Sequence, residues 1–99
     1  MKKQKIEQNQ EELVYVPIND TENYYYSSDL GLIASLISIS FQLVSIDKSE
    51  NPNKATFIIK KEFGIEDRIN EYFSGQLMVP ARVLFENTRW LKSSIYNSL

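Results

Sequence analysis

Apolar residues recur at helical spacing in three stretches of the chain, and each stretch predicts a helix. In the first, residues 28–39, the apolar stripe is wide enough to predict a largely buried helix. That stripe consists of Leu30, Ile33, Ala34 and Ile37, widened by Leu32, Leu36 and Ile39. The second, residues 65–73, predicts an amphipathic helix that follows Gly64 and stops at Gly75, a residue type common just past a helix end.

The third stretch follows Pro80, which suits the first turn of a helix, and runs to Tyr96. Its stripe consists of Leu84, Phe85, Leu91 and Ile95, with Trp90 nearby. Arg and Trp are favoured at the centres of binding interfaces, which makes Arg89-Trp90-Leu91-Lys92 a candidate contact segment. The sole tryptophan of a small domain is nevertheless more often part of the core, so we expect Trp90 to pack inward.

Shorter β-prone runs predict the strands. Residues 41–47 alternate so that Phe41 and Leu43 share a face, with Ser45 next on it. Residues 54–60 are again β-prone and follow a cluster of turn-forming residues, so the two runs predict a hairpin. The run at 13–18 contains Pro17, which lacks an N–H and confines a strand there to a sheet edge.

The stretch YYYSSDL, residues 24–30, marks the change from a strand to a helix. Ser27 or Ser28 can cap the helix by accepting a backbone N–H, with Asp29 near the positive end of the helix dipole. The tyrosines could stack on single-stranded bases at about 1–3 kcal/mol per base. Alternation sends Tyr25 to the face opposite Tyr24 and Tyr26, so at least one face packs on the helices, and we favour a structural role.

The predicted fold is α+β, in the order β-α-β-β-α-α. A small, roughly three-stranded and mainly antiparallel sheet is backed by helices, so that each element can bury one face. This single domain spans residues 23–97. Residues 1–12 are polar and charged, which predicts a disordered tail, and residues 13–22 predict an edge strand or an extended linker.

Composition narrows the chemistry that the chain can perform. It contains no histidine and no cysteine, so the commonest general base, the thiolate nucleophile and the commonest metal ligands are missing. The acidic residues Asp29, Glu62, Glu66, Asp67 and Glu71 are better explained as a solvated surface than as a metal site. We therefore expect no enzyme, no cofactor and no metal. The longest apolar run, residues 30–39, is too short to span a bilayer, and no signal peptide is evident, so a cytoplasmic protein is expected.

Charge gives a limited indication of partners. The net charge is −2 and the calculated pI is about 5.1, which argues against a large phosphate-binding footprint. The basic residues gather at the predicted hairpin and on the last helix. Together with two aromatic residues they form the candidate contact set: Lys54, Lys60, Lys61, Arg82, Arg89, Trp90, Lys92 and Tyr96.

Five short stretches form a recognisable pattern when they are taken together. They are residues 24–36, 41–47, 57–59, 71–75 and 91–96. The pattern resembles a small domain of unknown function found in phages and in bacteria rich in mobile elements, and the likeness covers about residues 24–97. Ser28 stands where this family has Thr before Asp-Leu, which leaves a hydroxyl for capping. The resemblance implies a phage or mobile-element setting but no activity.

Two hypotheses for function follow. The first is a binding module that engages a protein partner or itself, as a homodimer, through an open sheet edge or the last helix. The second is a small accessory protein that binds single-stranded DNA or RNA through the hairpin lysines and the last helix. The acidic balance favours the first, and the mobile-element setting keeps the second open.

Overall fold

The structure, a computed structural model, describes residues 20–48 and 54–97. The expected disordered tail, residues 1–12, lies outside the described residues, as do residues 13–19 of the expected edge strand or linker. The elements are β1 (Tyr24–Ser27), α1 (Leu30–Ser38), β2 (Leu43–Asp47), β3 (Thr56–Lys60), α2 (Ile65–Phe73) and α3 (Ala81–Asn97). Their order confirms the predicted α+β fold. No helix within the two described ranges is both long and apolar enough to cross a membrane.

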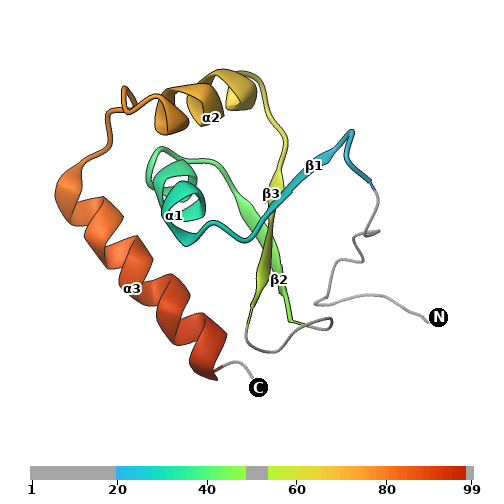
Figure 1. Ribbon diagram of the computed structural model, residues 1–99. Helices are drawn as coiled ribbons and strands as arrows, with labels where there is room; N and C mark the ends of the chain where they lie inside the picture. Colours follow the sequence, from blue (N-terminus) through green and yellow to red (C-terminus); the bar gives the residue numbers. More distant parts are fainter. Residues whose placement is uncertain (1–19, 49–53, 98–99) are drawn as a thin grey trace.

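The strands form one antiparallel sheet in which β3 lies between β1 and β2. Figure 1 shows the helices gathered on one side of this sheet, with α1 between the sheet and α3. Phe57 and Ile59 of β3 are buried in the core, and Tyr25 of β1 lies opposite Ile59 and packs against the same core. One face of the tyrosine run therefore has the structural role that alternation predicted.

An irregularity in β2 changes which of its residues face the helices. Leu43 pairs with Ile59, but Ser45 pairs with Ile58, so the register shifts between Leu43 and Ser45. Because paired residues of antiparallel strands point to the same side, Ser45 lies on the face away from the helices. Ile46, which pairs with Phe57, takes the core position instead. The expectation that Ser45 shares a face with Leu43 was wrong, because strict alternation does not anticipate a bulge.

Helix α1 is the most deeply buried element of the described structure. The side chains of Leu32, Ile33, Ala34 and Leu36 have no exposed surface. They meet Phe57 and Ile59 of the sheet, Ile65 of α2 and Leu91 of α3 in one hydrophobic cluster. The serine hydroxyls of α1 also have hydrogen-bond partners. Ser35 and Ser38 donate to the backbone carbonyls four residues earlier, at 2.8 and 2.6 Å. Asn87 of α3 donates to the Ser38 hydroxyl at 2.9 Å, which adds a polar tie to the apolar contact between the two helices.

The helix begins at Leu30, and its N-cap is Asp29 rather than Ser27 or Ser28. The Leu32 backbone N–H donates to Asp29 Oδ1 at 3.1 Å, and Asp29 has the extended backbone typical of a cap. Ser27 is still paired in β1, and its hydroxyl accepts the Asp29 N–H at 3.0 Å. The serine supports the cap residue, and the carboxylate caps the helix.

Two tyrosines from different elements lie close to this carboxylate. Burial and, to a lesser degree, the negative charge of Asp29 raise the pKa of Tyr72 in α2. The same two causes raise the pKa of Tyr25, partly opposed by its hydrogen bond with Ser27. Tyr72 also sits against the first turn of α1, where a Cβ on Gly31 would lie 2.5 Å from its hydroxyl oxygen. Glycine at position 31 therefore allows α2 to approach α1.

We predict that Gly31→Ala destabilises the domain unless Tyr72 is also changed. The added methyl group would collide with the Tyr72 hydroxyl but would lie 3.6 Å from the ring carbon that bears it, an ordinary contact. In a Tyr72→Phe background, alanine should be neutral or stabilising, because its helix propensity exceeds that of glycine by up to ~1 kcal/mol. Chemical denaturation of the four proteins should give a coupling of about 1 kcal/mol or more. Equal effects of Gly31→Ala in both backgrounds would contradict the close approach.

We predict that stability falls at alkaline pH and that Asp29→Asn reduces this loss. A raised pKa means that the folded state holds the tyrosine proton more tightly than the unfolded chain does. Stability should thus be constant below about pH 10, the ordinary tyrosine value, and fall as pH rises through the pKa values of folded Tyr25 and Tyr72. Asparagine keeps the cap but removes the charge. Tyrosinate absorbance, with Tyr25→Phe and Tyr72→Phe to assign the transitions, should show both pKa values lowered by Asp29→Asn. Unchanged values would mean that burial alone raises them.

Candidate interaction site

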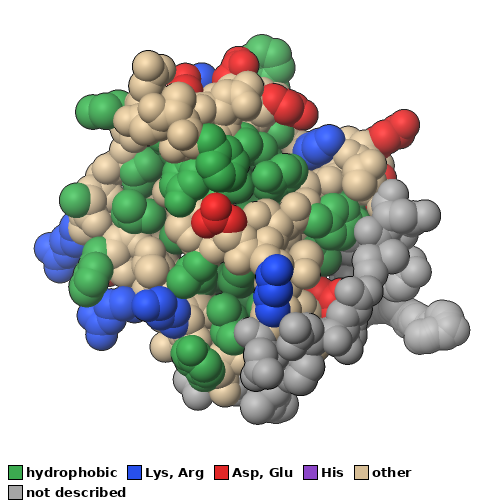
Figure 2. Space-filling model, in the orientation of Figure 1, with side chains coloured by type: hydrophobic (Ala, Val, Ile, Leu, Met, Phe, Trp, Pro, Cys, Tyr) green, Lys and Arg blue, Asp and Glu red, His purple; other side chains and the backbone are tan. Residues whose placement is uncertain are grey.

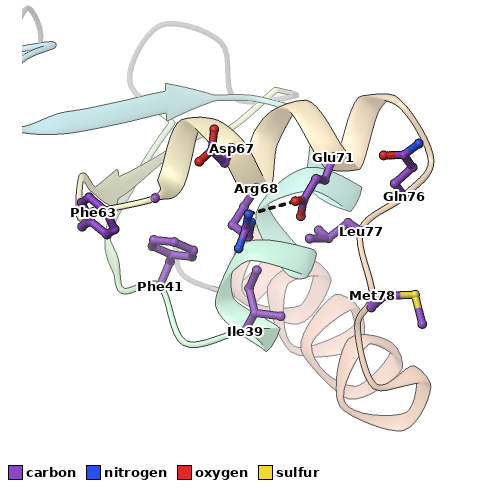
Figure 3. Close-up of a pocket in the computed structure, with 10 residues that line it drawn as sticks. Ile39, Phe41, Phe63, Asp67, Arg68, Glu71, Gln76, Leu77 and Met78 are labelled. Carbon is purple, nitrogen blue, oxygen red and sulfur yellow. Dashed lines mark hydrogen bonds and ion pairs between the residues drawn. The ribbon is translucent and has the colours of Figure 1, made fainter.

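A hollow of about 710 Å³ opens between α2, the turn that follows α1, and the segment that links α2 to α3. We call it the groove. Its apolar lining consists of Ile39, Phe41, Phe63, Leu77 and Met78. The rest of its lining consists of Gly64 and four polar or charged residues, Asp67, Arg68, Glu71 and Gln76. Figure 3 shows Phe41 and Phe63 toward one end and Met78 and Gln76 toward the other, with Arg68 and Leu77 between them. The groove is thus an elongated depression of mixed lining, with apolar side chains toward both ends and charged groups near its middle.

Glycines with positive φ set both ends of α2 and hence the shape of the groove. Gly64, at φ 88°, precedes the first residue of α2 and leaves Phe63 projecting into solvent. Gly75, at φ 79°, ends the helix as predicted. The Gly75 N–H donates to the Tyr72 carbonyl at 3.1 Å and the Gln76 N–H to the Glu71 carbonyl at 2.8 Å, the two bonds of a Schellman motif. This turn directs Leu77 and Met78 back along the groove.

The charged side chains of the groove differ in their ion pairs and hydrogen bonds. Arg68 extends from α2 toward Ile39 and pairs with Glu71 at 2.9 Å (Figure 3). Its Nε atom is buried and has no hydrogen-bond partner in the described part of the chain. Asp67 is exposed and has no ion-pair partner among the described residues. Asp67 is therefore the one groove carboxylate that has no ion-pair partner in the described part of the chain.

The apolar residues at the ends of the groove are unusually exposed. Phe63 is fully exposed and Met78 is 87% exposed, while Phe73 on α2 is 64% exposed. Single exposed apolar residues are normal, but several around a concave surface mark a binding site. Sequence reasoning missed Phe63 and Met78 because neither belongs to an apolar stripe. The available signal was that each is a large apolar residue in a segment predicted to be a connection.

A second exposed surface runs along α3. Leu84, Leu91 and Ile95 pack on the core as predicted, but Phe85 is 62% exposed and Trp90 is 52% exposed. The expectation that these two residues join the core was wrong. Each is one position from a core residue, which rotates it about 100° around the helix, and α1 packs against only one side of α3. Trp90 is therefore half accessible to a partner.

The spacing of the exposed residues places four of them on one stripe, which we call the α3 outer face. It consists of Phe85, Arg89, Lys92 and Tyr96. The Arg89 guanidinium lies 5.6 Å from the centre of the Phe85 ring, and Tyr96 is 75% exposed. Arg82 begins the same stripe but pairs with Glu86 at 3.2 Å. Lys92 has no ion-pair partner among the described residues. The outer face thus combines aromatic side chains with available positive charge.

The lysines of the predicted hairpin do not join this surface. Lys54 lies before β3, and Lys60 lies at the other end of that strand. Lys60 is 3.9 Å from Glu62, and Lys61 is 3.9 Å from Glu66 and donates to the Thr21 carbonyl at 2.6 Å. The structure therefore divides the predicted contact set into three: Lys54 by itself, two lysines beside carboxylates, and the residues of α3.

Within residues 20–48 and 54–97, no three acidic, histidine or cysteine side chains are grouped so as to hold a metal ion. The carboxylate of Asp29 is engaged in capping α1. The described surface presents apolar side chains, aromatic rings and charges of both signs. Figure 2 shows how these charges are distributed, with acidic side chains over α2 and basic ones along α3.

Comparison with known proteins places this arrangement in a family. The model of a domain of unknown function, DUF5659, matches residues 22–97, which include every helix and strand of the described structure. No curated protein and no solved structure matches the chain. Because the match covers most of its length, the chain belongs to the DUF5659 family.

Proposed function

We propose that this domain is a non-enzymatic interaction module that binds a protein partner through the groove. The observation that carries the proposal is the exposure of Phe63 and Met78 at the two ends of the groove. Keeping a large apolar side chain in water forgoes about 1.5–3 kcal/mol of burial energy, which an occupant would recover. The polar groups between them would orient that occupant.

The shape and chemistry of the groove suit a segment of another protein. A volume of about 710 Å³ can receive a few side chains of a partner. Ile39, Phe41 and Leu77 offer apolar contacts, while Asp67 offers a charge at the edge. The chain has no histidine or cysteine with which to build a nucleophile and base pair, which supports binding over catalysis.

A nucleic-acid-binding role is the alternative, and one observation favours it. Arg89 and Lys92 lie beside the rings of Phe85 and Tyr96, a combination that suits a single strand. The surface is small, because Lys60 and Lys61 lie beside Glu62 and Glu66 at the far end of the sheet. The phage or mobile-element setting and the cytoplasmic location implied by the sequence are compatible with both functions and form part of the proposal.

We predict that a photoreactive residue in the groove cross-links to protein in living cells. Benzoylphenylalanine in place of Phe63 keeps an aromatic side chain at a fully exposed position, so the fold should be unchanged. Cross-linked products should be discrete protein bands that resist nuclease. They should be lost when Met78→Asp is added, because a charge at that rim opposes apolar docking.

The control carries the same photoreactive residue in place of Glu22, an exposed position before β1. It should give no discrete product. Equal labelling from positions 22 and 63, or products from position 63 that vanish with nuclease, would count against a protein-binding groove.

We predict that labelled single-stranded oligonucleotides bind weakly or not at all, even at low salt. Phosphate binding draws most of its affinity from basic contacts, and the α3 outer face has two without an acidic partner among the described residues. Fluorescence anisotropy at low and physiological salt measures this directly. Strong binding that weakens steeply with salt and is lost in Arg89→Glu with Lys92→Glu, but not in Lys54→Glu, would establish the alternative function.

A further inference from the structure

Opposite charges are segregated on two helices of this domain. In α2, Glu66, Asp67 and Glu71 outnumber Arg68. In α3, Arg82, Arg89 and Lys92 outnumber Glu86. Figure 2 shows the two groups over separate parts of the molecule. Each group also has a charge that lacks an ion-pair partner among the described residues: Asp67 in the groove and Lys92 on the α3 outer face.

The two surfaces are complementary in shape and polarity as well as in charge. The groove is concave, with apolar side chains toward both ends and Asp67 at its edge, whereas the α3 outer face is a convex helical ridge that carries Phe85 and Tyr96. Helix α3 has 17 residues and is therefore about 25 Å long, enough to lie along an elongated depression. Arg89 is already held over the Phe85 ring, which reduces the entropy lost on docking.

These two surfaces cannot meet within one chain. Leu91 is fully buried against the core, and this fixes which side of α3 faces α1. Arg89 is two residues earlier, about 160° away around the helix, so the outer face points away from the rest of its own molecule. A contact between the outer face and a groove must therefore join two molecules.

We propose that the occupant of the groove is a second copy of this chain, which places its α3 outer face there with Arg89 and Lys92 toward Asp67. This inference rests on the proposed function and specifies the partner. Phe85 and Tyr96 of one copy meet Phe63 and Met78 of the other, and the opposite charges set the orientation. In a closed dimer, each copy supplies both its groove and its α3 outer face. Such a dimer has two-fold symmetry, the commonest symmetry of protein assemblies.

The test is the mass of the full chain in solution, freed of nucleic acid. Sedimentation equilibrium should show concentration-dependent association that weakens as salt is raised from low to physiological levels. Arg89→Glu with Lys92→Glu should raise the dissociation constant at least about tenfold, and Asp67→Lys should do the same. Lys54→Glu, a matched reversal at an exposed position outside both surfaces, should leave it unchanged.

Mixing the two charge-reversed proteins provides the decisive measurement. Glutamates on the α3 outer face of one protein then oppose the lysine in the groove of the other, while the second contact keeps its native charges, so association should return. A protein altered only in fold stability would not be rescued by mixing. Each variant should also keep its cooperative melting transition, since all the altered residues are exposed.

A monomer at all concentrations would overturn the inference, and so would association that neither charge reversal weakens or that mixing does not restore. The proposed function is tested separately. Cross-links from position 63 to a different protein, together with a monomeric mass, would remove self-association but leave the interaction module in place. If neither cross-links nor association were found, the interaction module and self-association would both be rejected.

Discussion

The burial of α1 is the constraint on which the rest of this domain depends. A helix of nine residues without a charged side chain must be covered on several sides, and the sheet, α2 and α3 each cover part of it. Each partner contributes a few fully buried groups, among them Phe57 from the sheet, Ile65 from α2 and Leu91 from α3. The positions of the sheet, α2 and α3 are therefore set by their packing against a single helix, α1.

Helices α2 and α3 each bury few side chains beyond those that pack against α1. Ile65 is the only fully buried residue of α2, and Leu91 is the only one of α3 among the described side chains. Because a domain of this size has a large surface for its volume, most of each outer helix remains in contact with solvent. The outer sides are thus free to carry charges of opposite sign and exposed rings. The surfaces proposed for binding are a consequence of how small the core is.

The junction between β1 and α1 shows how closely packing and local chemistry are linked. Asp29 caps the helix, and its charge lies near Tyr25 from the sheet and Tyr72 from α2. Gly31 allows Tyr72 to sit against the first helical turn. The stretch of three tyrosines, two serines and an aspartate is therefore a structural junction that brings three elements together, while Tyr24 and Tyr26 lie on the other face of the sheet.

The sequence by itself determined the order of the elements, the buried character of α1 and the end of α2 at Gly75, because periodicity and glycine conformation are encoded within a few residues. Only the tertiary structure decided that Asp29 is the cap, that Ile46 replaces Ser45 in the core, and that Phe85 and Trp90 are exposed. The groove was equally invisible, since Phe63 and Met78 lie in connections without a repeating pattern. In each case the outcome depends on which distant parts of the chain pack against the residue. The spacing of residues within a short stretch does not predict those contacts.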